Sequence, residues 1–243
     1  MTTTNARSYR LFTGIDVAAK TFTASWTTDR VQYAPPVTLD YTTAGIAQLH
    51  QHLQATGVTP ADTLIVLQAT GSYWITLAMA LHTSGFVVSV VNPAQAYYWS
   101  QSLSRRGKTD PLDARKLTQF AAERQPLPWT PPPAVYHELR QRLVARDTLL
   151  ALRQHARNQR HALAQWPVLV PAVMEQLDAI LADLDQRISA VEAEISQVLQ
   201  QGEWARSAAL LQSITGIGRL TAAWILVLTV NFTRCASAAA ATN

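Results

Sequence analysis

The first 125 residues alternate between short apolar segments and longer segments with helical spacing, and this alternation predicts an α/β domain. The segments expected to form strands are residues 11–26, 31–39, 63–67 and 86–91, the second of which is interrupted by two prolines. Residues 63–67 form an apolar run, which is typical of a parallel strand buried on both faces, and residues 86–91 are expected to form another buried strand. The segments expected to form helices are residues 42–54 (capped by Thr42 or Thr43), 71–84, 94–103 and 111–124.

A different pattern begins after Trp129-Thr-Pro-Pro-Pro133, a stiff segment that a helix cannot cross. Residues 135–165 and 173–199 repeat apolar side chains at spacings of three and four, and two prolines force a turn between them. This pattern predicts an antiparallel coiled-coil hairpin, which serves either as a packing arm or in dimerisation. The expected organisation is an α/β domain at 8–128, a linker at 129–133, a coiled-coil domain at 134–206 and a further helical region at 207–243.

Composition restricts the class of protein. The chain has 243 residues, of which 48% are hydrophobic and 15% charged, so wholesale disorder is excluded. The longest apolar run, near residues 220–230, is shorter than the roughly 20 residues that span a bilayer, and the amino terminus lacks the apolar stretch of a signal peptide. A single cysteine, Cys235, excludes an internal disulfide framework and a cysteine-based zinc site. These properties predict a soluble protein of a reducing cytoplasm, with no membrane partner.

The charges are unevenly distributed. Residues 101–165 hold 12 basic and five acidic residues, whereas residues 166–206 hold seven acidic and two basic ones. This asymmetry predicts that one element faces nucleic acid and another faces solvent or a partner. The expected phosphate contacts are Arg105, Arg106 and Lys108, followed on the first long helix by Arg140, Arg142, Arg146, Arg153, Arg157 and Arg160. The alternative for the helix is a solvated face, and for Tyr97, Tyr98 and Trp99 the alternative to base stacking is core packing.

Three carboxylates occupy notable positions. Asp16 lies in an apolar strand segment, where a carboxylate is costly to bury without a cation or hydrogen bonds. Asp110 and Asp113 open an expected helix three residues apart, so both lie on one face. On spacing alone, helix capping is the simpler explanation of that pair. Taken with Asp16, the pair suggests a magnesium site, in which Gln68 at the end of a central strand has the position of a fourth ligand.

Four segments of the chain carry a family resemblance. They are Gly14-Ile-Asp-Val-Ala-Ala-Lys20, Gln68-Ala-Thr-Gly-Ser-Tyr-Trp74, Val91-Asn-Pro93 and Lys108-Thr-Asp-Pro-Leu-Asp-Ala-Arg115. In this order they resemble the DEDD transposases of bridge-RNA-guided insertion sequences, the IS110 family, and their Piv-type invertase relatives. The resemblance extends from about residue 11 to residue 230. It implies an α/β RuvC-like (RNase H-type) domain, then an all-α antiparallel coiled-coil hairpin, and then the start of a helical C-terminal transposase domain at residues 207–243.

The resemblance also implies a metal site. Asp16, Asp110 and Asp113 match three of the four metal ligands of the family, which would hold Mg²⁺ or Mn²⁺. The fourth ligand is expected to be a glutamate, and this chain has Gln68 in its place. Because an amide removes one negative charge from the cluster, a second magnesium ion should bind poorly and catalysis should be impaired.

The family further implies a serine nucleophile in the C-terminal domain, beyond Gly216-Ile-Gly218. The chain ends about where that part should begin, and Ser207, Ser213 and Ser237 match no such motif, so a truncated and catalytically incomplete chain is expected. Residues 214–223 also resemble a helix-hairpin-helix, in which the backbone near Gly216 and Gly218 would bind phosphate. A glycine-rich turn between packed helices explains these residues equally well.

Two functions follow from these observations. The first is an RNA-guided DNA transposase or recombinase that acts by metal-assisted strand cleavage and exchange, with DNA and a structured bridge RNA as partners. The second is a non-catalytic fragment that binds DNA or RNA, dimerises and modulates intact transposase. Both imply a homo-oligomer, dimer or tetramer, formed through the coiled coil in a bacterial cytoplasm and associated with the nucleoid when bound to DNA. A sugar-kinase-like ATPase and a RuvC-type junction nuclease fit less well, since the first needs a second lobe and the second lacks a coiled coil.

Overall fold

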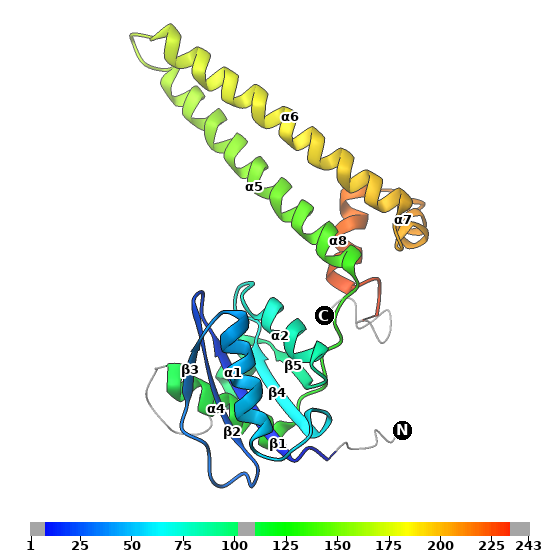
Figure 1. The fold of residues 1–243 in the computed structure, drawn as a ribbon. Coiled ribbons are helices and arrows are strands. Elements are labelled where there is room, and N and C mark those ends of the chain that lie inside the picture. The colour runs from blue at the N-terminus through cyan, green and yellow to red at the C-terminus, as the bar shows by residue number, and fades with distance from the viewer. Residues whose placement is uncertain (1–7, 102–109, 234–243) are drawn as a thin grey trace. The chain divides into compact units, whose positions relative to one another are not determined.

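The structure is a computed structural model that describes residues 8–101 and 110–233. The chain divides into two compact units, Met1–Pro131 and Pro132–Asn243. The first unit contains a sheet with helices, and the second contains helices in its described part (Figure 1). In the described residues, every helix is too short or too polar to cross a bilayer.

A mixed five-stranded sheet forms the centre of the first unit, in the order β3-β2-β1-β4-β5. Strands β1 and β2 pair antiparallel, as do β2 and β3, whereas β4 runs parallel to β1 and to β5. The prediction of a buried parallel strand at residues 63–67 is confirmed, and residues 86–91, expected to be another buried strand, contain its parallel neighbour β5. The strands are β1 (Leu11–Val17), β2 (Thr21–Thr27), β3 (Val37–Asp40), β4 (Thr63–Gln68) and β5 (Val87–Val91).

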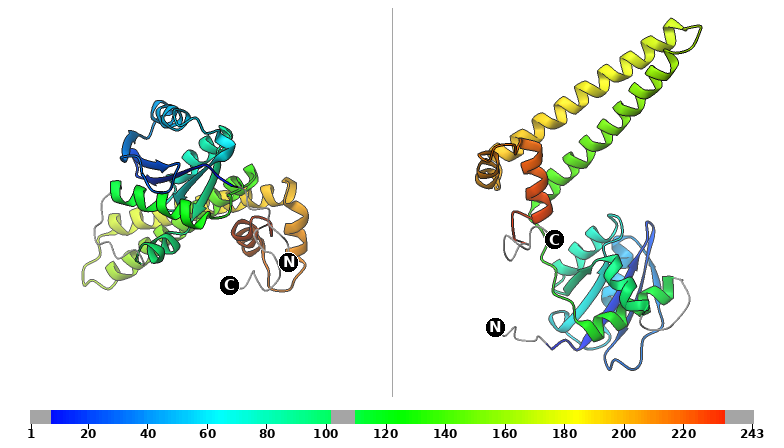
Figure 2. Two further views of the ribbon diagram at one scale, coloured as in Figure 1. Left: turned by 90° about the horizontal axis from the view of Figure 1, so that it is seen from below. Right: turned by 180° about the vertical axis from the view of Figure 1, so that it is seen from behind.

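Helices cover both faces of this sheet (Figure 2). Leucines of α1 (Thr43–Gln54) and α2 (Trp74–Thr83) pack on one face, together with Ile15 and Leu67. Residues of α3 (Pro93–Gln101) and α4 (Asp110–Arg124) pack on the other face, together with Phe12 and Val66. Odd-numbered residues of β1 and β4 therefore face α1 and α2, and even-numbered residues face α4, as the alternation of a strand requires.

The approach of α4 to β1 is close enough to require a glycine. A Cβ atom added to Gly14 would lie 2.2 Å from the backbone nitrogen of Thr118 and 2.6 Å from the carbonyl oxygen of Ala114. The Gly14 amide donates a hydrogen bond to the Thr118 hydroxyl at 3.1 Å. The helix backbone thus rests on the strand backbone at Gly14, two residues before Asp16.

Three segments differ from the sequence-based prediction. Residues 11–26 form a hairpin of two strands, β1 and β2, because the exposed Ala18–Lys20 turn is closed by a hydrogen bond from the Ala18 amide to the Thr21 carbonyl. Residues 31–36 are not strand, because the Asp29 carboxylate accepts hydrogen bonds from the amides of Val31 and Gln32 and forms a turn. Helix α2 begins at Trp74 and not at residue 71, since Gly71 is left-handed with a φ of 59°.

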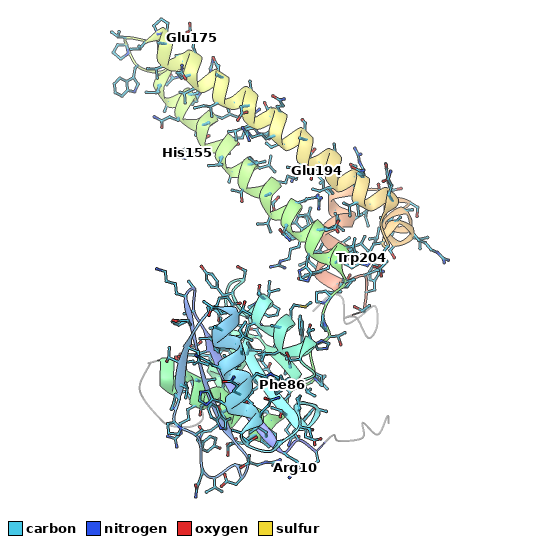
Figure 3. The ribbon with its side chains drawn as sticks, viewed as in Figure 1. Arg10, Phe86, His155, Glu175, Glu194 and Trp204 are labelled. Atoms are coloured by element: carbon cyan, nitrogen blue, oxygen red, sulfur yellow. The ribbon has the colours of Figure 1, made fainter. Side chains whose placement is uncertain are left out.

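The second unit is built around two long helices, α5 (Ala134–Leu163) and α6 (Pro171–Gln201). They run antiparallel side by side, with the turn at residues 164–170 (Figure 1). At the other end of the hairpin, α7 (Ala205–Gln212) and α8 (Arg219–Thr229) pack against them. Leu139, Ile195 and Leu226 belong to one apolar cluster with the buried Trp204, which is labelled in Figure 3.

Gly14→Ala should destabilise the first unit by about 3 kcal/mol, because the added methyl group overlaps backbone atoms that cannot rotate away. Gly218→Ala is a suitable control, since a Cβ there meets no atom within 4 Å, and it should cost about 1 kcal/mol or less. Urea unfolding followed by circular dichroism measures both. Equal midpoints for Gly14→Ala and the unchanged chain would contradict the close approach of α4.

Candidate active site

Asp16 and Gln68 lie next to each other at the carboxyl ends of two parallel strands. Ile15 of β1 is in register with Leu67 of β4, so the next residues, Asp16 and Gln68, occupy equivalent positions at the edge of the sheet. Both are even-numbered and therefore belong to the face covered by α4, and both are half-buried. The carboxyl edge of parallel strands is where α/β proteins commonly bind ligands.

Helix α4 contributes Asp113 to this region. Its neighbour Ala114 touches Gly14 through the backbone contact described above, and Leu117, one turn later, is buried against the sheet. The Asp113 carboxylate is 29% exposed and accepts a hydrogen bond from the Lys116 ammonium at 3.3 Å. Asp110 is the first residue of α4, and its side chain lies outside the described part of the structure.

These side chains fit a divalent cation by their chemistry. Asp16 and Asp113 supply carboxylate oxygens and Gln68 an amide oxygen, the hard ligands that Mg²⁺ and Mn²⁺ prefer. Among the residues whose side chains are described, no three His, Cys, Asp or Glu gather into a metal site. The described part of the candidate site therefore holds two carboxylates, one amide and a lysine, which is less negative than a four-carboxylate cluster.

The motif that follows Gln68 shapes the backbone at the site. Gly71 takes the left-handed conformation that glycine adopts at low cost, and its carbonyl accepts a hydrogen bond from the Trp74 indole at 3.2 Å. The Tyr73 carbonyl accepts a hydrogen bond from the Tyr41 hydroxyl. The Ala69 amide bonds to the Val91 carbonyl at 3.0 Å, which ties the end of β4 to β5. Most of this motif thus builds the turn that carries Gln68.

Ion pairs between α5 and α6 account for several of the arginines predicted to bind nucleic acid. Arg142 donates to Glu194 at 2.9 Å, Arg146 to Glu192 at 2.5 Å, Arg153 to Asp185 at 2.7 Å, and Arg160 to both carboxylate oxygens of Asp178. The Arg160 guanidinium lowers the pKa of Asp178 below its ordinary value. The acidic stretch of the sequence thus lies along the basic helix, where the sequence-based interpretation had assigned it to solvent or a partner.

The remaining predicted basic contacts differ in their surroundings. Arg140 is exposed, donates to the Tyr136 hydroxyl at 3.3 Å and helps to lower the pKa of His137, whose burial is the larger cause. Arg157 is exposed and has no carboxylate within 4.0 Å among the described residues. Arg105, Arg106 and Lys108 lie outside the described residues. Arg140 and Arg157 are therefore the described arginines of α5 that remain available for a phosphate.

The aromatic residues of α3 divide between surface and core. Tyr97 and Tyr98 are 57% and 72% exposed and contact each other edge to face, whereas Trp99 is 8% exposed and packs on Phe120. The alternative of core packing holds for Trp99, and base stacking stays open for the two tyrosines.

The glycine turn between α7 and α8 has the shape of a tight connection between two helices. Gly216 is left-handed with a φ of 91°, and Gly218 is the N-cap of α8. No side chain caps the amino end of α8, and Ile214 beside it is 54% exposed. This geometry fits both interpretations of the turn, so phosphate binding by Gly216 and Gly218 stays a prediction.

Comparison with known protein families agrees with the motif at this sheet edge. A family model described as a transposase, the IS110-type DEDD transposase, matches residues 13–165, which is more than half of the chain. This chain belongs to that family. The matched range begins one residue before Gly14 and includes the sheet, apart from the first two residues of β1, together with α4 and α5.

Two curated relatives extend the similarity beyond the matched range. The pilin gene-inverting proteins of Moraxella lacunata and Moraxella bovis are 28% and 27% identical to the chain over 221 and 220 residues. These alignments cover 90% of this chain and 66% of each relative. The chain therefore spans just under two thirds of the length of these relatives.

Sequence reasoning missed two residues of the site region, Lys116 and Thr118. Lys116 was visible in the sequence as the residue three positions after Asp113, a spacing at which helical side chains meet. Thr118 gave no such signal, because its hydrogen bonds join segments 93 and 104 residues apart. Only the position of α4 on the sheet reveals the role of that hydroxyl.

Arg153→Ala and Arg157→Ala should separate the structural and nucleic-acid roles of α5. Arg153→Ala removes an interhelical ion pair and should lower the free energy of unfolding by roughly 0.2–1 kcal/mol, with a smaller loss at high salt. Arg157→Ala should leave that free energy unchanged and weaken binding to a random DNA duplex, because its charge is not used within the hairpin. Thermal unfolding and fluorescence anisotropy test the two variants. The reverse assignment of effects would contradict this division.

Proposed function

We propose that this chain carries the nuclease-like domain of an RNA-guided DNA recombinase, with Asp16, Asp110 and Asp113 as the metal ligands. The main support is the position of Asp16 and Gln68 on adjoining parallel strands beneath the helix that carries Asp113. Support also comes from the family to which the chain belongs and from its similarity to proteins named for the inversion of pilin genes. The α/β domain is then RuvC-like, of the RNase H type.

In this proposal the protein's own side chains prepare the site. Asp16 and Asp113, with Asp110, hold Mg²⁺ or Mn²⁺ at the carboxyl edge of β1 and β4. When bound, such ions polarise a phosphodiester and stabilise the charge that develops during strand cleavage. Gly14 and α4 fix the spacing of the two chain segments that supply the carboxylates.

Gln68 makes the proposed site a weak one. A glutamine keeps one oxygen ligand and loses a negative charge, and Lys116 already neutralises part of the charge of Asp113. We therefore propose that the chain binds one ion more readily than two, and that its strand cleavage is impaired. The second function, a non-catalytic fragment that binds nucleic acid and modulates intact transposase, is favoured by these same two residues.

The hairpin of α5 and α6 has the proposed role of a coiled coil that joins copies of the chain into a dimer or tetramer. The ion pairs support a heptad register, because a step of seven residues along α5, from Arg146 to Arg153 and to Arg160, matches a step of seven back along α6. Exposed apolar side chains remain for contacts between copies, among them Val144, Leu152 and Ile180.

Purification of the chain from its own host at moderate salt, followed by sequencing of the retained RNA, tests guide binding. One structured RNA encoded beside the gene is the expected result. Retention of RNA without sequence preference, or of no RNA, would contradict RNA guidance and favour the role of a non-specific binder.

Gln68→Glu should raise the affinity for Mn²⁺ by roughly 10-fold, since it restores a carboxylate at the edge of β4 beside Asp16. Titration calorimetry measures the dissociation constant. Gln48→Glu adds the same charge to an exposed position of α1, on the other face of the sheet, and should leave the affinity unchanged. Equal affinities for Gln68→Glu and the unchanged chain would count against the four-ligand site.

A further inference from the structure

The Thr118 hydroxyl joins three elements of the first unit at one buried point. It accepts a hydrogen bond from the Gly14 amide of β1 at 3.1 Å and lies 2.8 Å from the Ser25 carbonyl of β2 and 2.9 Å from the Ala114 carbonyl of α4. The Thr118 side chain is fully buried, so water does not compete for these bonds. The single proton of the hydroxyl is shared between two carbonyls: that of Ala114, the ordinary acceptor for a helical threonine in the preceding turn, and that of Ser25, which like the Gly14 amide lies outside the helix.

The two bonds to the sheet fall on residues that face each other. Gly14 and Ser25 are partners in the β1–β2 pair, and the hydroxyl contacts the amide of one and the carbonyl of the other. A hydroxyl can donate one hydrogen bond and accept another. Because its partners lie on two neighbouring strands, the contact fixes the position of α4 both along β1 and across the sheet. Apolar packing alone is less selective, because methyl groups tolerate small shifts without the loss of a directional bond.

The Thr118 contact lies close in the sequence to both candidate metal ligands, Asp16 and Asp113. Gly14 is two residues before Asp16 on the same face of β1, and Thr118 is five residues after Asp113 on α4. A slide or rotation of α4 that breaks the Thr118 bonds would therefore also move Asp113 relative to Asp16. A cation held by oxygen atoms from both segments senses such a movement, since its ligand distances vary within only a few tenths of an ångström.

We infer that Thr118 is a positioning residue for the metal site, which sets the register of α4 on β1 so that Asp16 and Asp113 can share one cation. This inference rests on the proposed function, because it presumes that the two carboxylates are metal ligands. The inference concerns the hydroxyl group of Thr118 and not its apolar packing. Metal affinity should therefore depend on the oxygen atom of this side chain and not on its methyl group.

Three variants test the inference. Thr118→Val keeps the shape and removes the hydroxyl, and Thr118→Ser keeps the hydroxyl and removes the methyl group. Thr13→Val is the matched control, since Thr13 of β1 is as buried as Thr118 and its hydroxyl has no hydrogen-bond partner among the described residues. Each is made in the unchanged chain and in the Gln68→Glu background. Titration calorimetry and the electron paramagnetic resonance spectrum of Mn²⁺ report ion binding, and circular dichroism reports folding.

The expected result is a loss of Mn²⁺ affinity of roughly 10-fold in Thr118→Val, the size typical of groups that orient metal ligands. Thr118→Ser and Thr13→Val should bind within about twofold of their parent, which marks the hydroxyl of residue 118 as the cause. Should Thr118→Val fail to fold, Thr118→Ala takes its place, since it removes the hydroxyl and introduces no new atom into the buried site.

Two outcomes would overturn the inference about Thr118 and leave the proposed metal site intact. One is full Mn²⁺ affinity in the variant that lacks the hydroxyl, and the other is an equal loss in Thr118→Ser, which would indicate packing by the methyl group. Failure of the proposed function gives a different result. In that case Mn²⁺ binding is either not saturable in both the unchanged chain and Gln68→Glu, or it survives the substitution Asp16→Asn. That last result would remove the metal site and the inference together.

Discussion

The backbone contact between α4 and β1 at Gly14 is the constraint on which the first unit depends. The glycine has no Cβ atom, so the helix can lie directly on the strand, and the Thr118 hydroxyl fills the polar gap that remains. The carboxyl edge of β1, the edge of β4 and the first turns of α4 thus come together. A larger side chain at position 14 would separate the three segments that supply the candidate site.

The close approach of α4 explains why the motif around Asp16 includes residues that are not candidate metal ligands. Within Gly14-Ile-Asp-Val17, the aspartate is the candidate ligand, and the glycine two residues earlier gives α4 access to the strand. In the segment after Gln68, Gly71 and Trp74 form the turn. Asn92 accepts a hydrogen bond from the Ala94 amide at 2.9 Å and so starts α3.

Much of the fold was predictable because its signals are local. The apolar runs of β4 and β5, the cap at Thr42 and the two long helices were all identified from residue spacing. The division of residues 11–26 into two strands was missed, since β-branched and aromatic residues recur on both sides of the turn and the turn itself has no glycine or proline. The antiparallel pairing of α5 with α6 was predicted, whereas the Thr118 contact and the ion pairs between these two helices were missed because they join residues distant in the sequence.

The ion pairs of the hairpin also change what its charge can do. Four of the six arginines of α5 already face carboxylates of the same chain, so a nucleic acid laid along α5 would meet mainly Arg140 and Arg157. Each neutralised phosphate releases about 0.9 counterion from a duplex, and the salt dependence of binding follows that number. The arginine content of α5 thus overstates its electrostatic contribution about threefold, and the salt dependence of any nucleic-acid binding by α5 should correspond to about two neutralised phosphates and not six.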